Sequence, residues 1–360
     1  MKYRRGGTSG VEDGGTVDGA LRELALQLAY FSGTARIVAA YRGGVGVILR
    51  FERVRPARGD AFQPLQRSEI TPERLDRLCG ALRRWGLDVV TLDEALQRTL
   101  EPAKGQRRYA VLTFDGAYRD VATHAAAVLA RHRHPYTIFV PTGFVDGIAP
   151  MWWLALEQVI LRHDRLSLVV AGTERHFDVG GTRQKYEVFA FLDGWIRTLA
   201  PQDQLNAAHD LCQRYSVDMT ALSRAAAMEW SDLRALARDP LVEIGSATVH
   251  HPVLTTLPAA AALREMRMGR QVAEAALDRA VRHFAYPFGG RGTIGRRDVG
   301  LAQDAGFVSA ATTEPRVVRP RDPAAPYALP RLSWDGRRRS LRGFGVLTAG
   351  IGGPGAGDER

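Results

Sequence analysis

The sequence predicts an α/β fold in which helices cover parallel strands and a mainly helical insertion interrupts the series. Short apolar runs alternate with helical patterns before residue 150 and again after residue 240. Between them, residues 151–230 are mostly helical, with one β-hairpin expected at Leu166–Val170 and Arg175–Asp178. These observations favour one large domain with an insertion over two average domains in a chain of 360 residues.

Local signals place the individual elements. Buried strands are expected where apolar residues occur together, at 45–49, 89–92, 110–114, 137–140, 242–245, 284–286 and 309–312. Thr71-Pro72-Glu73 begins a helix, because Thr caps the N-terminus, Pro suits the first helical position and an acidic residue suits the first turn. That helix ends near Gly86, and further helices are expected from Asp93, up to His132, at 258–282 and at 298–305.

Composition sets the domain limits. We expect a disordered tail at 1–18, a helical segment at 19–44, the main domain at 45–345 and a flexible tail at 346–360. The first tail is Gly-rich and polar, and the last is Gly-rich.

Charge and cysteine content exclude several classes of protein. The net charge is +10, from 49 Lys and Arg against 39 Asp and Glu, but the cations are scattered and form no nucleic-acid recognition motif. Cys79 and Cys212 lie far apart, which argues against a disulfide framework or a thiolate zinc site. The N-terminal residues do not resemble a secretory signal, and no run of about 18 apolar residues predicts a membrane span. The expected location is the cytoplasm.

Three polar segments follow predicted strands. They are Thr113–Asp120, Glu243–Pro252 and Phe284–Gly289. In parallel α/β barrels, catalytic groups are assembled at the carboxyl ends of the strands. Each segment alone is weak evidence, because an Asp at the end of a strand often caps the following helix.

Together, the residues of these segments and their order along the chain resemble the motifs of the polysaccharide deacetylase family, also called the NodB homology domain or carbohydrate esterase family 4. Thr113-Phe114-Asp115-Gly116 matches the family's Thr-Phe-Asp-Asp-Gly motif, and the segment from Ala247 to His251 matches its His-Ser/Thr-x-x-His motif. Phe284–Gly289 matches a Phe-Ala-Tyr-Pro-Tyr-Gly variant, and the resemblance extends over residues 45–335. It implies a distorted (β/α) barrel that removes acetyl groups from N-acetylated glycans such as chitooligosaccharides.

The resemblance also implies a role for each matching position. Asp115 stands where the family has its general base, and Phe288 stands where a backbone N–H stabilises the oxyanion. His251 keeps the position of one metal ligand. The other two ligand positions hold Gly116 and Ala247, whose side chains cannot bind the divalent metal, zinc, that the family implies.

A catalytic zinc ion usually needs three protein ligands, so zinc binding requires other side chains in place of the two missing ligands. His250 adjoins His251, although neighbouring side chains of an extended segment point to opposite sides. Glu52 follows the first strand and could complete a set with Asp115 and His251, or instead pair with Arg50 or Arg53.

The substrate cleft is expected to include Tyr286, Trp153 and Arg331, with a salt bridge that fixes the last strand as the alternative role of Arg331. The C-terminal region offers no His for protonation of the leaving group.

Three hypotheses remain open. The chain deacetylates an N-acetylated oligo- or polysaccharide, or it is a metal-free pseudoenzyme that binds a carbohydrate or protein partner through the same cleft, or Asp115 and His251 hydrolyse without metal. The insertion at 151–230 could dock a protein partner.

Overall fold

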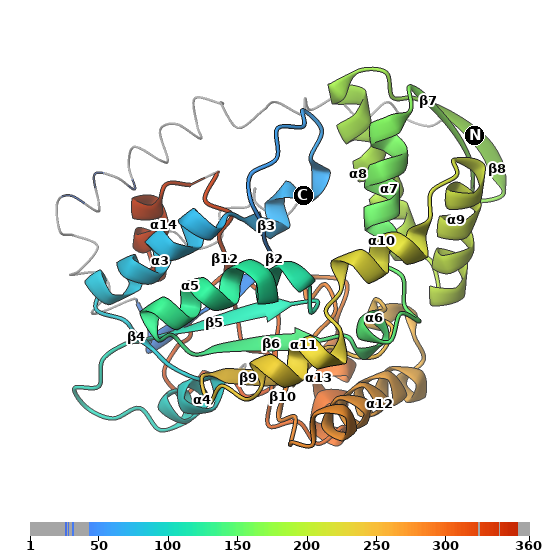
Figure 1. Cartoon of the computed structure of the whole chain (residues 1–360). Helices are drawn as coiled ribbons and strands as arrows, with labels where there is room; N and C mark the ends of the chain where they lie inside the picture. The colour runs from blue at the N-terminus through green and yellow to red at the C-terminus, as the bar shows by residue number, and fades with distance from the viewer. Residues whose placement is uncertain are drawn as a thin grey trace, which may run out of the picture.

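The computed structural model describes residues 26, 28, 31, 43–322, 325–337 and 339–351. Its centre is a parallel sheet with the strand order β11-β10-β9-β6-β5-β1-β12, and β4 also pairs with β5 (Figure 1). The sheet curls into a half-barrel. The strands are β1 (Gly46–Phe51), β4 (Asp88–Val89), β5 (Tyr109–Asp115), β6 (Tyr136–Val140), β9 (Val242–Ser246), β10 (His283–Ala285), β11 (Ser309–Ala311) and β12 (Leu332–Ser333).

Helices connect and cover these strands. Thr71 caps α3 as expected, because its side chain accepts a hydrogen bond from the Arg74 N–H and Pro72 occupies the first turn. The covering helices are α3 (Pro72–Arg84), α4 (Leu92–Leu100), α5 (Ala126–His132) after the π-helical turn η2 (Val121–Ala125), α11 (Trp230–Leu236), α12 (Ala259–Leu277), α13 (Arg296–Asp304) and α14 (Leu341–Thr348). Short elements are β2 (Arg53–Val54), β3 (Glu69–Ile70), η1 (Pro64–Ser68), α6 (Thr142–Val145) and η3 (Leu254–Thr256).

The predicted insertion is a separate layer of helices. It comprises α7 (Trp152–Arg162), the antiparallel hairpin β7 (Arg165–Val170) and β8 (Thr173–Asp178), α8 (Thr182–Thr198), α9 (Pro201–Arg214) and α10 (Met219–Ala226). Figure 1 shows α7, α8, α9 and the hairpin gathered beyond one end of the sheet. The expected hairpin is therefore confirmed.

The two faces of the sheet carry different cores, because successive side chains of a strand point to opposite faces. In β5, Ala110 and Leu112 belong to the outer core beneath the helices, whereas Val111 belongs to a smaller core inside the half-barrel. Phe139 of β6 and Ala285 of β10 share this inner core. By the same alternation, Asp115 continues the inner face at the carboxyl end of β5.

Several predicted boundaries were wrong. Helix α12 ends at Leu277 rather than at 282, because Asp278 adopts a left-handed conformation with φ of 50°. The strand expected at 89–92 ends at Val89, since Thr91 caps α4 and Leu92 begins it. The flexible tail expected from residue 346 overlaps α14, in which Val346 is fully buried.

The predicted tail at 1–18 and most of the segment at 19–44 lie outside the described residues, as do residues 352–360. In the part of the chain that is described, no helix has the length and apolar character needed to cross a membrane.

Candidate active site

The three polar segments meet at one edge of the sheet. Asp115 ends β5, the loop from Ala247 to His251 follows β9, and the loop with Phe288 follows β10. Strands β5, β6, β9 and β10 are neighbours and parallel, so their carboxyl ends lie together. The structure thus brings together the segments that the sequence singled out.

The carboxylate of Asp115 is held by two guanidinium groups. Arg331 donates two parallel hydrogen bonds, from Nη1 to Oδ1 at 2.7 Å and from Nη2 to Oδ2 at 2.9 Å. Arg50 of β1 donates from Nε to Oδ2 at 2.7 Å and from Nη2 to Glu52. Asp115 is 8% exposed, so both oxygens face arginine rather than solvent.

Arg331 is a structural residue rather than a substrate-facing one. Its side chain is 1% exposed and also donates to the Thr312 carbonyl at 2.7 Å and to Thr113 Oγ1 at 3.1 Å. The expectation that Arg331 lines the cleft was wrong, and the alternative of a salt bridge is confirmed. That salt bridge joins the segment before β12 to β5.

The two arginines keep Asp115 ionised. Burial alone would raise the pKa of this carboxyl group, but the charges of Arg331 and Arg50 outweigh burial and hold the pKa below its ordinary value. The same pairing raises the pKa of Arg50 despite its burial. Asp115 is therefore a poor proton acceptor near neutral pH.

His251 is enclosed by aromatic rings. Its ring centroid lies 4.8 Å from that of Phe288, 5.4 Å from that of Phe144 and 5.9 Å from that of Trp153. The buried Nδ1 atom has no hydrogen-bond partner among the described residues. Burial, with smaller contributions from Arg197 and Arg50, lowers the pKa of His251 to about 4, so the imidazole is neutral at physiological pH.

This environment predicts a pH dependence of stability. The unfolded chain takes up a proton on His251 near pH 6.5, whereas the folded chain does so only near pH 4, so stability falls as pH falls through that window. We expect His251→Phe, which keeps an aromatic ring, to remove about 2–3 kcal/mol of the loss between pH 7 and pH 4. Urea unfolding at a series of pH values measures it.

His250→Gln is the matched control. The hydrogen bond and charge of Glu265 raise the pKa of His250, so its contribution to stability is present below pH 6.5 and is lost as pH rises through the raised pKa. The His250 substitution should therefore change the opposite side of the profile. If His251→Phe loses as much stability between pH 7 and pH 4 as the wild type does, the conclusion that the imidazole is buried and neutral is wrong.

The proposed substitute ligands do not converge. Nδ1 of His250 lies 2.7 Å from Glu265, and the His250 side chain is exposed. Glu52 pairs with Arg50, as the alternative reading of the sequence anticipated. Among the described residues, Glu52, Asp115 and His251 do not form a cluster of three potential ligand atoms.

The remaining predicted cleft residues have mixed locations. Trp153 packs beside His251, and its Nε1 donates to the Tyr118 hydroxyl at 3.0 Å. Tyr286 is not in the cleft, because it is buried in a separate apolar cluster beside Phe284 and donates its hydroxyl to the Tyr327 carbonyl. Two residues after outward-facing Phe284, Tyr286 follows the alternation of the strand.

Phe288 combines a free N–H with a covered ring. Its backbone has φ of 61°, and its N–H donates to no acceptor among the described residues. The guanidinium carbon of Arg197, from α8 of the insertion, lies 4.2 Å from the Phe288 ring centroid. The insertion therefore covers the predicted oxyanion side of the site.

Comparison with known proteins finds a similar family and a similar fold. The family described as polysaccharide deacetylase matches residues 180–308, which include the positions of Ala247, His251 and Phe288. The match does not include Asp115. Residues 180–308 are thus similar to polysaccharide deacetylases.

Solved structures show the same fold. The deacetylase PplD of Streptococcus pyogenes, in complex with acetate, is 12% identical, with a TM-score of 0.56 over 84% of this chain and 97% of that one. IcaB of Ammonifex degensii is 18% identical, with a TM-score of 0.56 over 86% and 98%. The polysaccharide deacetylase BC0361 of Bacillus cereus is 12% identical, with a TM-score of 0.52 over 84% and 68%. No curated protein sequence matches the chain.

The residues at the matching positions do not fit the divalent metal that the resemblance implies. Gly116 has no side chain, and Ala247 belongs to the apolar core inside the half-barrel. Asp115 is occupied by Arg331 and Arg50, which leaves His251 as the only imidazole at the expected positions. One imidazole beside a guanidinium cation is not a zinc site.

Sequence reasoning missed two cationic side chains of the site, Arg50 beside Asp115 and Arg197 beside Phe288. Arg50 was considered only as a partner for Glu52, and Arg197 was not considered. The available signal for Arg50 was a charged residue that follows the apolar run of β1 on the inward-facing side. Arg197 carried no such signal, because an Arg at the end of an amphipathic helix is ordinary.

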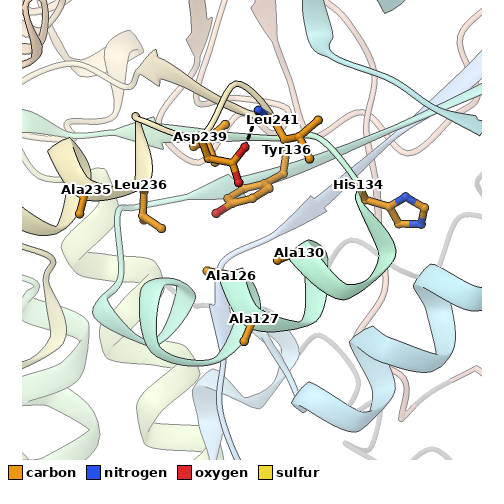
Figure 2. A pocket seen from close by; sticks show the side chains of 10 residues that line it. Ala126, Ala127, Ala130, His134, Tyr136, Ala235, Leu236, Asp239 and Leu241 are labelled. Carbon is orange, nitrogen blue, oxygen red and sulfur yellow. Dashed lines mark hydrogen bonds between the residues drawn. The ribbon is translucent and has the colours of Figure 1, made fainter.

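Two hollows among the described residues differ in size and in place. A hollow of about 10 Å³, enough for about one water molecule, is lined by Arg50, Phe51, Glu52, Arg67, Ser68, Glu69, Ile70, Ser333 and Trp334. A larger cavity of about 300 Å³ lies between α5 and α11 (Figure 2). Tyr136 and Val242, which line it, begin β6 and β9, so this cavity is at the opposite end of the strands from Asp115.

Proposed function

We propose that this chain is a metal-free member of the polysaccharide deacetylase family that binds an N-acetylated glycan at the carboxyl end of its strands and does not hydrolyse it. The observation that carries the proposal is the occupation of both Asp115 oxygens by Arg331 and Arg50. A general base must instead face the water whose proton it accepts.

Hydrolysis of an amide needs an activated water and an electrophile that stabilises the developing oxyanion. Asp115 is bound to arginines with a lowered pKa, and the buried neutral His251 has a pKa of about 4. The Phe288 N–H still offers one donor for a carbonyl oxygen. An acetyl group can thus be recognised without being cleaved.

The rim of the site suits sugar hydroxyl groups. Arg50 and Glu52 are partly exposed, and Trp334 and Ser333 lie beside them around the small hollow. Charged groups form strong hydrogen bonds with hydroxyl groups. Docking of a protein partner on the insertion remains a separate prediction.

Two measurements on the full chain test the proposal. With N-acetylglucosamine oligomers, we expect no acetate release above buffer, with or without added zinc, and no difference between wild type and Asp115→Ala. Calorimetric titration should detect binding that Glu52→Ala weakens by at least about fivefold, since it removes a charged hydrogen-bonding group.

Glu187→Ala is the matched control, because Glu187 also pairs with an arginine, on the exposed face of α8. It should bind as the wild type does. Zinc-dependent acetate release that Asp115→Ala abolishes would overturn the non-hydrolysing function. Absence of glycan binding, or an equal loss of affinity in Glu52→Ala and Glu187→Ala, would overturn the assignment of the glycan-binding site to Arg50 and Glu52.

A further inference from the structure

A second polar cluster lies at the other end of the half-barrel. Asp93 is in the first turn of α4, Glu243 is the second residue of β9, and His283 begins β10. One potential ligand atom from each lies within 4.8 Å of the other two. We propose that these residues form a binding site for a divalent cation of the zinc class.

His283 provides the observation that points to a ligand. The residue is 2% exposed, and its Nδ1 lies 2.8 Å from Ser309 Oγ, a contact that orients the ring. The buried Nε2 lies 3.1 Å from Asp93 Oδ1, but it has no hydrogen-bond partner among the described residues. A ligating imidazole characteristically has one nitrogen fixed by a neighbour and the other directed at the metal.

The two carboxylates are also held in place. Glu243 Oε2 accepts from the Leu92 N–H at 2.7 Å and from Thr137 Oγ1 at 2.9 Å, which leaves Oε1 with only a 3.4 Å contact to the Asp93 N–H. Asp93 turns Oδ1 toward His283 and Oδ2 toward Arg282 at 3.1 Å. Each residue thus presents one under-used donor atom to the cluster.

The charge balance favours a cation. Two carboxylates and an imidazole face one another, and the exposed Arg282 contacts Asp93 through the carboxylate oxygen that does not face His283. Two oxygens and one imidazole nitrogen suit zinc better than calcium or magnesium.

The position implies a structural role. The cluster joins α4 to β9 and β10 at the amino ends of the strands, whereas Asp115 and His251 lie at the carboxyl ends. Groups at the amino end of such a sheet contribute to stability rather than to catalysis. This inference does not depend on the proposed function.

Zinc titration of the metal-stripped full chain, followed by calorimetry and thermal unfolding, tests the site. We expect one zinc per chain and a zinc-dependent rise in Tm. Asp93→Asn, at a partly exposed position, and Glu243→Gln should each weaken zinc binding at least tenfold. Near-ultraviolet circular dichroism of the zinc-free variants shows that they fold.

Asp76→Asn is the matched control. Asp76 also lies 3.0 Å from a histidine nitrogen, in His132, and 3.0 Å from an arginine nitrogen, in Arg131, but has no third ligand. It should leave zinc affinity unchanged. Absence of stoichiometric zinc, or unchanged affinity in Asp93→Asn, would overturn this site alone. Zinc lost in His251→Phe together with acetate release would overturn the proposed function as well.

Discussion

Replacing Asp115 by Asn is expected to lower the free energy of unfolding by about 3–5 kcal/mol, because it leaves the buried Arg331 guanidinium without a counter-ion and removes one of the two carboxylates that pair with Arg50. Arg331 has no access to solvent that could compensate, and Arg50 retains only Glu52. Chemical denaturation at pH 7 measures the change. A carboxylate kept free for catalysis would show little of this dependence.

The dependence of stability on pH in the acid range tests the pairing of Asp115 with Arg331 and Arg50 independently. Since the pKa of folded Asp115 lies below its unfolded value, its contribution is complete above about pH 4 and is lost as pH falls through the folded value. The difference in stability between wild type and Asp115→Asn should shrink over that range.

Asp120→Asn is the control within the same segment. Asp120 bonds one arginine, Arg53 at 2.8 Å, and also accepts from the Val54 N–H at 3.1 Å. We expect a smaller loss, about 1–3 kcal/mol. Asp115→Asn combined with Arg331→Gln should cost less than the sum of the single changes. A loss below about 1 kcal/mol in Asp115→Asn, with acetate release abolished, would refute the structural role.

Gly116→Asp introduces the residue type that serves as a metal ligand in the family that the sequence resembles. It is expected to destabilise the chain by about 2–4 kcal/mol and to create no zinc site at Asp115. Gly116 has φ of 95°, which side chains of L-residues rarely adopt. A Cβ atom there would also lie 2.8 Å from Cε2 of Tyr118. The Tyr118 ring cannot withdraw easily, because it is buried, bonded to Trp153 and covered by Arg53.

Gly86→Ala separates the two causes. Gly86 has φ of 76°, but nothing lies within 4 Å of an added Cβ atom, so only the backbone term remains, about 1–2 kcal/mol. Denaturation of Gly116→Ala, Gly116→Asp and Gly86→Ala should place both Gly116 variants below Gly86→Ala. Equal stability of all three would show that Tyr118 yields and that the contact is unimportant.

Much of the architecture followed from local patterns in the sequence. The apolar runs predicted β1, β5, β6, β9, β10 and β11 within a few residues, because buried parallel strands have few alternatives. The two-residue strand β12 lacked any such run and was not predicted.

The site was harder to predict, because its chemistry depends on partners distant in sequence. The position of Asp115 at a strand end could be predicted, but its pairing with Arg331 joins residues 216 positions apart. Glu243 gave a signal that was not used, since a carboxylate inside a buried strand needs partners. Asp93 and His283 are distant from Glu243 in the sequence and lie beside it only in the folded chain.

The pairing of Arg50 with Asp115 also bears on how this site could change over evolutionary time. A three-ligand centre at this place would require ligating side chains at 116 and 247 and removal of the cation at 50. The first change meets Tyr118, the second fills an apolar interior with imidazole, and the third leaves Asp115 with a single partner. Each single change therefore lowers stability, so packing and the ion pair together oppose the stepwise assembly of such a centre.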